Sequence, residues 1–294
     1  MQTLPGANDK EKLDSLTALN HKEQAVWFLN AFWNSVGEAN AEQVWSFKQK
    51  FDELDSEKRA EGSTLDEMQA HRFLETIKET LTVQAMREKL RSTGAIAGQI
   101  RRVPLTHYLI MKYNVDWHDL VNAVLGDMEE IRKAQQKLDE VQAALREAEQ
   151  REQESKQAKR ELDAALKDVK DQEDARNNKT AELQKKSEEG GLVSRNRAKA
   201  ELAQHLAEDP LPLRKAKITL EAAVKKADKA AIAAEAAVEE ARVKFDEAQA
   251  YLEKVKKGGS PKGALWWMER ELLEARAYLP KSKGGYNKRE GAAQ

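Results

Sequence analysis

Residues 213–255 decide the fold, and their sequence is LRKAKITLEAAVKKADKAAIAAEAAVEEARVKFDEAQAYLEKV. The stretch has neither Gly nor Pro, and its apolar residues recur every three or four positions, which is the spacing of one helix face. The stripe is Leu213, Ala216, Leu220, Ala223, Ala227, Ala230, Ala234, Ala237, Ala241, Ala248, Tyr251 and Val255. Because small side chains let two helix axes approach closely, the stretch predicts a long helix with a helical partner packed against it.

The predicted partner is residues 128–188, a run of 61 residues without Gly or Pro. As a continuous helix it would span about 90 Å. Its heptad stripe is Ile131, Ala134, Leu138, Val141, Leu145, Ala148, Glu152, Ser155, Lys159, Leu162, Leu166 and Val169. The polar residues in the middle of the stripe predict a weak point in the packing.

Helix breakers separate these two arms. Gly190-Gly191 and the segment Asp209-Pro-Leu-Pro212 flank a short helical piece, Ser194 to Ala207. Two long helices joined by such a break are expected to fold back as an antiparallel hairpin. An intermolecular coiled coil is the alternative, because both arms have usable seams.

The first 125 residues differ from the two arms, because they hold four of the six Trp. They are expected to form a compact helical domain. Helices are expected over His21–Val36, Ala41–Leu54, Leu65–Ile77 and Val83–Leu90, with a further one opening at Pro104. The pattern is a helix–loop–helix unit repeated twice, with loops near residues 55–64 and 92–103.

The C-terminal part begins with a strong helix start, because Ser260 is a good cap and Pro261 suits the first helical position. A helix is expected over Lys262 to Leu279, followed by a basic tail, 281–294, with the composition of a disordered segment. Adjacent Trp266 and Trp267 point about 100° apart on that helix. The favoured interpretation is a helix wedged between two surfaces, and the alternative is an exposed anchor for a partner.

The predicted fold class is therefore all-α, in three parts. Residues 1–125 form a degenerate EF-hand-like helical domain. Residues 126–257 form a long antiparallel helical hairpin with a break at 190–212. Residues 258–294 hold the Trp-Trp helix and the tail.

The paired loops raise the question of calcium. A calcium loop needs oxygen ligands at positions 1, 3, 5, 7, 9 and 12. With Leu65 at hydrophobic position 8, the first loop has Lys58, Ala60 and Gly62 at ligand positions and Gln69 at position 12. With Val103 at position 8, the second loop has Ile96, Gly98 and Ile100 at positions 1, 3 and 5, Arg101 and Arg102 at positions 6 and 7, and His107 at position 12. Neither loop is expected to hold the ion.

Composition excludes several other classes. The absence of Cys excludes disulfides, thiolate metal sites and cysteine nucleophiles. No apolar run reaches the roughly 18 residues of a membrane span, and the N-terminus has no signal-peptide pattern. The five His lack metal-ligand spacing, and neither a phosphate-binding nor a nucleophile motif occurs. We therefore expect no enzyme activity, no catalytic, cofactor or metal site, and no membrane partner.

Charge is distributed unevenly along the chain. Residues 1–189 carry 29 basic and 36 acidic side chains, whereas residues 190–294 carry 21 basic and 15 acidic ones, a net charge of +6. This excess is too mild for nucleic-acid binding but suits an acidic protein surface. A basic cluster flanks the break in the hairpin: Arg195, Arg197, Lys199, Arg214, Lys215 and Lys217. Taken alone, these charges indicate only a solvated surface. They are expected at the exposed end that connects the two arms, however, and contact residues often lie at such ends.

Three stretches resemble a known family. They are EQAVWFLNAFW at 23–33, YLIMKY at 108–113 and, most specific, GALWWMEREL at 263–272. They resemble the calcium-regulated actin-bundling proteins of amoebae and other protists. The resemblance implies an EF-hand-like domain and cytoplasmic cross-linking of actin filaments, whose acidic surface suits the basic cluster. The missing calcium ligands depart from the family pattern and put calcium regulation in doubt.

The leading hypothesis is a non-enzymatic actin-filament cross-linker of the cytoplasm and cytoskeleton, with self-association possible. A structural coiled-coil component of a microtubule or ciliary assembly would share the long helices and the degenerate EF-hand fold. A calcium sensor is the third hypothesis, and the loops argue against it.

Calcium should not bind the folded chain. We expect millimolar calcium to leave the thermal midpoint unchanged, because the loops lack ligands and only a bound ion stabilises the native state by mass action. Thermal melts with calcium and, as the control, with magnesium test this. A rise of several degrees with calcium alone would contradict it.

Overall fold

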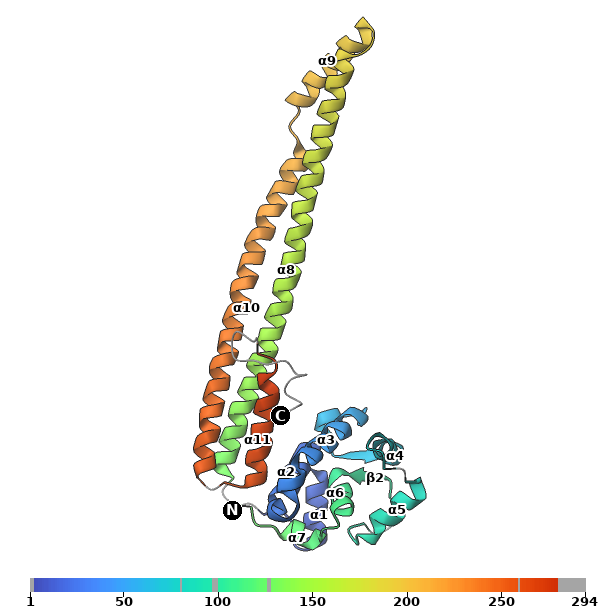
Figure 1. Ribbon diagram of the computed structural model, residues 1–294, viewed down its shortest axis with the longest axis vertical. Coiled ribbons are helices and arrows are strands. Elements are labelled where there is room, and N and C mark those ends of the chain that lie inside the picture. Colours follow the sequence, from blue (N-terminus) through green and yellow to red (C-terminus); the bar gives the residue numbers. More distant parts are fainter. Residues whose placement is uncertain (1–2, 80, 97–99, 126–127, 259, 280–294) are drawn as a thin grey trace. The chain divides into compact units, whose positions relative to one another are not determined.

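The computed structural model describes residues 3–79, 81–96, 100–125, 128–258 and 260–279. It divides into two compact units, one of residues 1–141 and 244–294 and the other of residues 142–243. Two long helices, α8 (Glu129–Glu188) and α10 (Leu211–Lys257), contribute to both units (Figure 1). In the described part of the chain, no helix is long and apolar enough to cross a membrane.

Short helices build most of the first unit. They are α1 (Asp9–Ala18), α2 (His21–Ala31), α3 (Glu38–Leu54), α4 (Glu67–Thr76), α5 (Val83–Ser92), α6 (Leu105–Tyr113), α7 (Trp117–Asn122) and α11 (Lys262–Arg276), with a 3-10 turn, η2, at Arg59–Glu61. The single helix expected over His21–Val36 is interrupted: α2 ends at Ala31, and a π-helical turn, η1, follows at Trp33–Gly37. Helices α1 and α7 were not predicted.

The two predicted loops meet in a small antiparallel sheet. Strand β1 (Thr64–Asp66) pairs with β2 (Arg102–Pro104), and Leu65 lies opposite Val103. The buried Gln24 of α2 joins the two loops, because its Nε2 donates to the carbonyl of Ser63 at 2.8 Å and its Oε1 accepts from the backbone N–H of Thr106 at 2.9 Å. A buried amide with these bonds fixes both loops on one helix.

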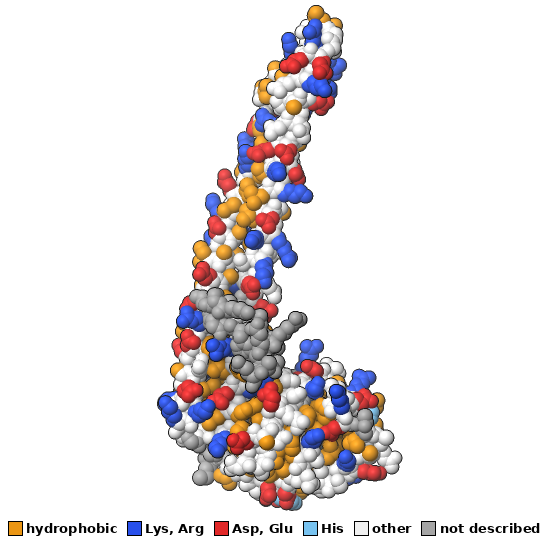
Figure 2. Space-filling model, in the orientation of Figure 1, with side chains coloured by type: hydrophobic (Ala, Val, Ile, Leu, Met, Phe, Trp, Pro, Cys, Tyr) orange, Lys and Arg blue, Asp and Glu red, His pale blue; other side chains and the backbone are white. Residues whose placement is uncertain are grey.

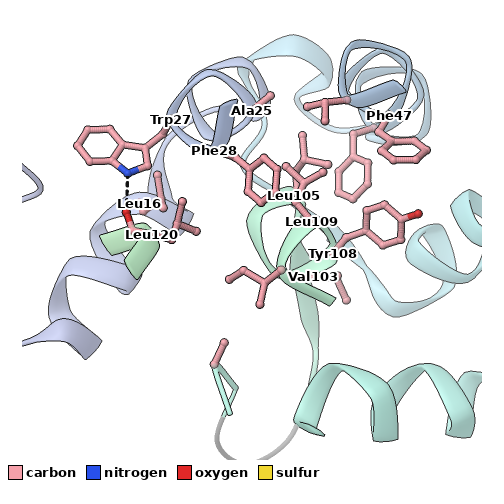
Figure 3. Packing of buried hydrophobic residues seen from close by; sticks show 14 of the residues in the cluster. Leu16, Ala25, Trp27, Phe28, Phe47, Val103, Leu105, Tyr108, Leu109 and Leu120 are labelled. Carbon is pink, nitrogen blue, oxygen red and sulfur yellow. Dashed lines mark hydrogen bonds between the residues drawn. The ribbon is translucent and has the colours of Figure 1, made fainter. Parts of the chain in front are cut away.

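Aromatic rings fill the core between the paired loops and helices α2 and α3 (Figure 3). Phe47 and Phe73 both contact Tyr108 edge-on, with ring centroids 5.2 and 4.8 Å apart. Trp27 donates its indole N–H to the carbonyl of Leu120 at 3.0 Å. Edge-to-face rings and satisfied indoles are the arrangements that such cores favour.

Helix α11 completes this core from the other end of the chain. Trp267 is buried and its ring lies 4.7 Å from that of Trp45, whereas Trp266 is half-buried against the same cluster. Trp267 therefore packs in the core and is not an exposed anchor for a partner. The approach is close at Gly263, since a Cβ there would lie 2.6 Å from the backbone nitrogen of Asn30. Ala264 donates its backbone N–H to Asn30 Oδ1 at 2.7 Å.

In the second unit, α8 packs antiparallel against α9 (Leu192–Ala207) and α10 (Figure 1). Ion pairs fix the register: Lys226 lies 2.6 Å from Glu161, and Lys217 lies 3.0 Å from Glu173. The predicted alanine seam is present, with Ala216, Ala223, Ala237 and Ala241 buried. The antiparallel hairpin is thus confirmed within one chain.

One detail of the predicted seam on α8 is wrong. The heptad stripe placed Lys159 and Leu166 on the buried face, but Lys159 is exposed and Leu166 is 49% exposed. Their neighbours Ala158 and Ala165 are buried instead. Against a partner seam of alanines, the small residues take the closest positions and the larger ones lie at the side.

Replacing Gly263 with Ala should destabilise the first unit. The new Cβ would collide with the backbone of α2, and such overpacking costs about 1–3 kcal/mol, more than the gain in helix propensity. We expect a melting temperature lower by several degrees in a thermal scan. Gly191→Ala is the matched control, because no atom lies within 4 Å of a Cβ there. Equal melting of the two variants would contradict the close approach.

Ala241→Leu should destabilise the hairpin. Ala241 is fully buried in the seam, so three added carbons force the arms apart at a cost of about 1–3 kcal/mol. The control is Ala231→Leu at an exposed position of the same helix. Circular dichroism melts should separate the two variants, and an unchanged midpoint for Ala241→Leu would refute the packing.

Candidate functional site

The connecting end of the hairpin is a tight turn between α8 and α9. Gly190 has a φ of +100°, a conformation that residues with side chains rarely adopt. The turn sends α9 back along α8, where His205 Nε2 lies 3.2 Å from Thr180 Oγ1 and Ala198 is buried. The first turns of α9 therefore lie at the end of the arm.

The six predicted basic residues fall into two sets. Arg195, Arg197 and Lys199 lie on the first turns of α9, and Arg195 is half-buried whereas the other two are exposed. Arg214, Lys215 and Lys217 lie on the first turns of α10, and all three are exposed. The pairing of Lys217 with Glu173 puts the second set about 20 Å from the end of α8, at 1.5 Å per residue.

Some of these charges already have partners. Arg197 pairs with Glu201 at 2.9 Å, Arg214 with Asp209 at 3.0 Å, and Lys217 with Glu173. Exposed pairs of this kind contribute about 0–1 kcal/mol, so an acidic ligand can replace the acidic partner at little cost. In the described part of the chain, Arg195, Lys199 and Lys215 make no ion pair.

Sequence reasoning missed an apolar pair at the same end. Leu192 and Val193 follow the Gly-Gly turn directly and are 71% and 85% exposed. The sequence feature that could have identified them is their position, because they lie outside the apolar stripe that the arms bury. Apolar side chains beside basic ones are typical of a protein contact, in which buried apolar groups supply affinity and charges guide association.

The paired loops of the first unit use their oxygens for capping. Asp66 accepts from the backbone N–H of Gln69 at 2.8 Å, and Gln69 accepts from that of Asp66 at 2.9 Å, which caps α4. Asp55 Oδ1 accepts from the backbone N–H of Lys58 at 3.0 Å. Within the described ranges, no group of three or more His, Cys, Asp or Glu side chains could hold a metal ion. Gly98 of the second loop lies outside the described residues.

Comparisons with known proteins agree with this architecture. Residues 126–258 match the family described as F actin bundling C terminal. The chain also resembles the crystal structure of the 34 kDa F-actin bundling protein from Dictyostelium discoideum, with a TM-score of 0.54 and 22% sequence identity. That match covers 94% of this chain and 99% of the other, and it shows the fold. No curated protein matches the chain.

Proposed function

We propose that this protein binds actin filaments and cross-links them into bundles. The observation that carries the proposal is the match of residues 126–258 to the F actin bundling C terminal family, which covers both arms of the hairpin and the basic end. The proposal includes the three-part division of the chain at about residues 125 and 257.

The contact surface in this proposal is the connecting end of the hairpin. There, Arg195, Arg197 and Lys199 would lie against acidic side chains of the filament, while Leu192 and Val193 supply apolar contact. The second basic set, Arg214, Lys215 and Lys217, extends the same positive surface along the arm. Since charge attraction between exposed groups is screened over about 8 Å at physiological salt, binding should weaken as salt rises.

The role is structural rather than catalytic. A cross-linker needs contact surfaces, and long helices with paired exposed charges supply these without a water-excluding pocket. Calcium plays no part, because the loop positions that should ligate the ion hold Lys58, Ala60 and Gly62 in the first unit. Its place of action would be the cytoplasmic cytoskeleton.

A microtubule or ciliary coiled-coil component is the alternative. Such a protein would have long helices similar to those of an actin cross-linker, but it would pellet with microtubules rather than with actin filaments. Parallel co-sedimentation with each polymer distinguishes the two, and the domain match favours actin.

Reversing Arg195, Arg197 and Lys199 to Glu should weaken actin co-sedimentation about tenfold or more. The reason is loss of charge complementarity at the end of the hairpin. Helicity and melting should not change, since these residues lie outside the buried seam. Deleting residues 281–294, which lie outside the described residues, should weaken binding less.

The matched control reverses Lys159, Lys167 and Lys170, three exposed residues of α8 away from the turn. It changes net charge by the same amount, so equal loss of binding in both variants would show that only total charge matters. Wild-type binding by the α9 variant, with loss on deleting the tail, would overturn the assignment to the hairpin end.

A further inference from the structure

Helix α10 has a second apolar stripe on the face opposite the alanine seam. Ile232 stands nine residues from both Ala223 and Ala241, which is half a rotation of the helix at 100° per residue. The exposed members of this stripe are Leu211, Ile218, Ile232 and Val243, at 50%, 61%, 70% and 47% exposure. Large aliphatic side chains held open to solvent along one helix face are typical of a surface that another helix covers.

Four charges on this face are placed symmetrically about Ile232, whereas Asp228 has Ala236 at its mirror position. Lys229 lies three residues before it and Glu235 three residues after it, while Lys225 and Glu239 lie seven residues away on either side. The two lysines are four residues apart, as are the two glutamates, and such like-charge spacing is unfavourable in an isolated helix. Within the chain, Asp228 lies between the lysines and Glu239 pairs with Arg242 at 3.3 Å. A half-turn about an axis through Ile232 exchanges the two lysines with the two glutamates.

We infer that α10 pairs antiparallel with α10 of a second copy of this chain, on a two-fold axis at Ile232. In that pairing, Ile232 meets its own counterpart, Lys229 faces Glu235 of the partner subunit and Lys225 faces Glu239 of the partner subunit. A parallel pairing would set Lys225 against Lys225 and Glu235 against Glu235. The charge pattern thus selects the antiparallel partner, as charges beside an apolar seam do in coiled coils.

The pairing would give each assembly two hairpin ends pointing in opposite directions. Lys226 is paired with Glu161, so Ile232 lies roughly 50 Å from the turn, and the two ends of a dimer would lie about 100 Å apart. Taken with the proposed function, on which this consequence alone rests, one filament site per chain then suffices for bundling.

Cysteine cross-linking tests the axis directly, because the natural chain has no Cys. Ile232→Cys should form a disulfide dimer with copper phenanthroline as the oxidant, at least about tenfold faster than Leu166→Cys, an exposed control on α8. Ile218→Cys should behave like the control, since 28 residues, about 42 Å, would separate its two copies. Equal rates for Ile232→Cys and Leu166→Cys, or fast cross-linking of Ile218→Cys, would overturn the antiparallel pairing.

A charge swap in the Ile232→Cys background tests the register. Lys225→Glu should slow cross-linking several-fold, and adding Glu239→Lys should restore it, because both symmetry-related pairs are then rebuilt with opposite sign. A double variant as slow as the single one would overturn the predicted pairs.

Filament assays separate this inference from the proposed function. Ile232→Glu should leave actin co-sedimentation at high speed unchanged and abolish low-speed pelleting of bundles. Loss of filament binding itself would show that this face contacts actin, and would overturn the dimer. Unchanged bundling would overturn it too, while leaving filament binding by the hairpin end intact.

Discussion

The contact of Gly263 with the backbone of α2 is the constraint on which the rest of the architecture depends. No methyl group fits between α11 and α2, so the last described helix lies directly against the second one. Because α11 follows α10 and α2 precedes α8, the hairpin must return to the unit from which it leaves. The 60 residues of α8 are accordingly matched by the 16 of α9 and the 47 of α10. Salt bridges secure the contact at its edges, with Lys22 lying 2.6 Å from Glu271.

The paired loops are held in place by a strand pairing and by side-chain caps. Leu65 pairs with Val103, Gln24 bridges the two loops, and Asp66 and Gln69 cap the helix that follows. All of these contacts are made by residues of the chain itself.

Much of the fold could be predicted because strong periodicity and helix breakers lie in the same chain. The alanine stripe follows from helical periodicity, and the turn at Gly190 follows from a helix-breaking Gly pair. The helix of Trp267 follows from the helix start that precedes it. The errors arose where tertiary packing decides between neighbours, as when Ala165 rather than Leu166 enters the seam. The basic residues of the candidate site could be found from charge alone. Leu192 and Val193 had only a weaker signal, their position outside the stripe that the arms bury, and they were missed.

The packing of α11 against α2 also affects how the chain folds during synthesis. Asn30 leaves the ribosome more than 200 residues before Ala264, its hydrogen-bond partner. Until then Trp45 lacks the ring of Trp267, and the first unit remains open on one side. At about 5–20 residues per second, this interval lasts roughly 10–50 s, which is long compared with the folding of small helical domains. A nascent chain therefore carries an exposed aromatic surface through most of its synthesis, and a chaperone that shields such surfaces would act on this protein before its last helix appears.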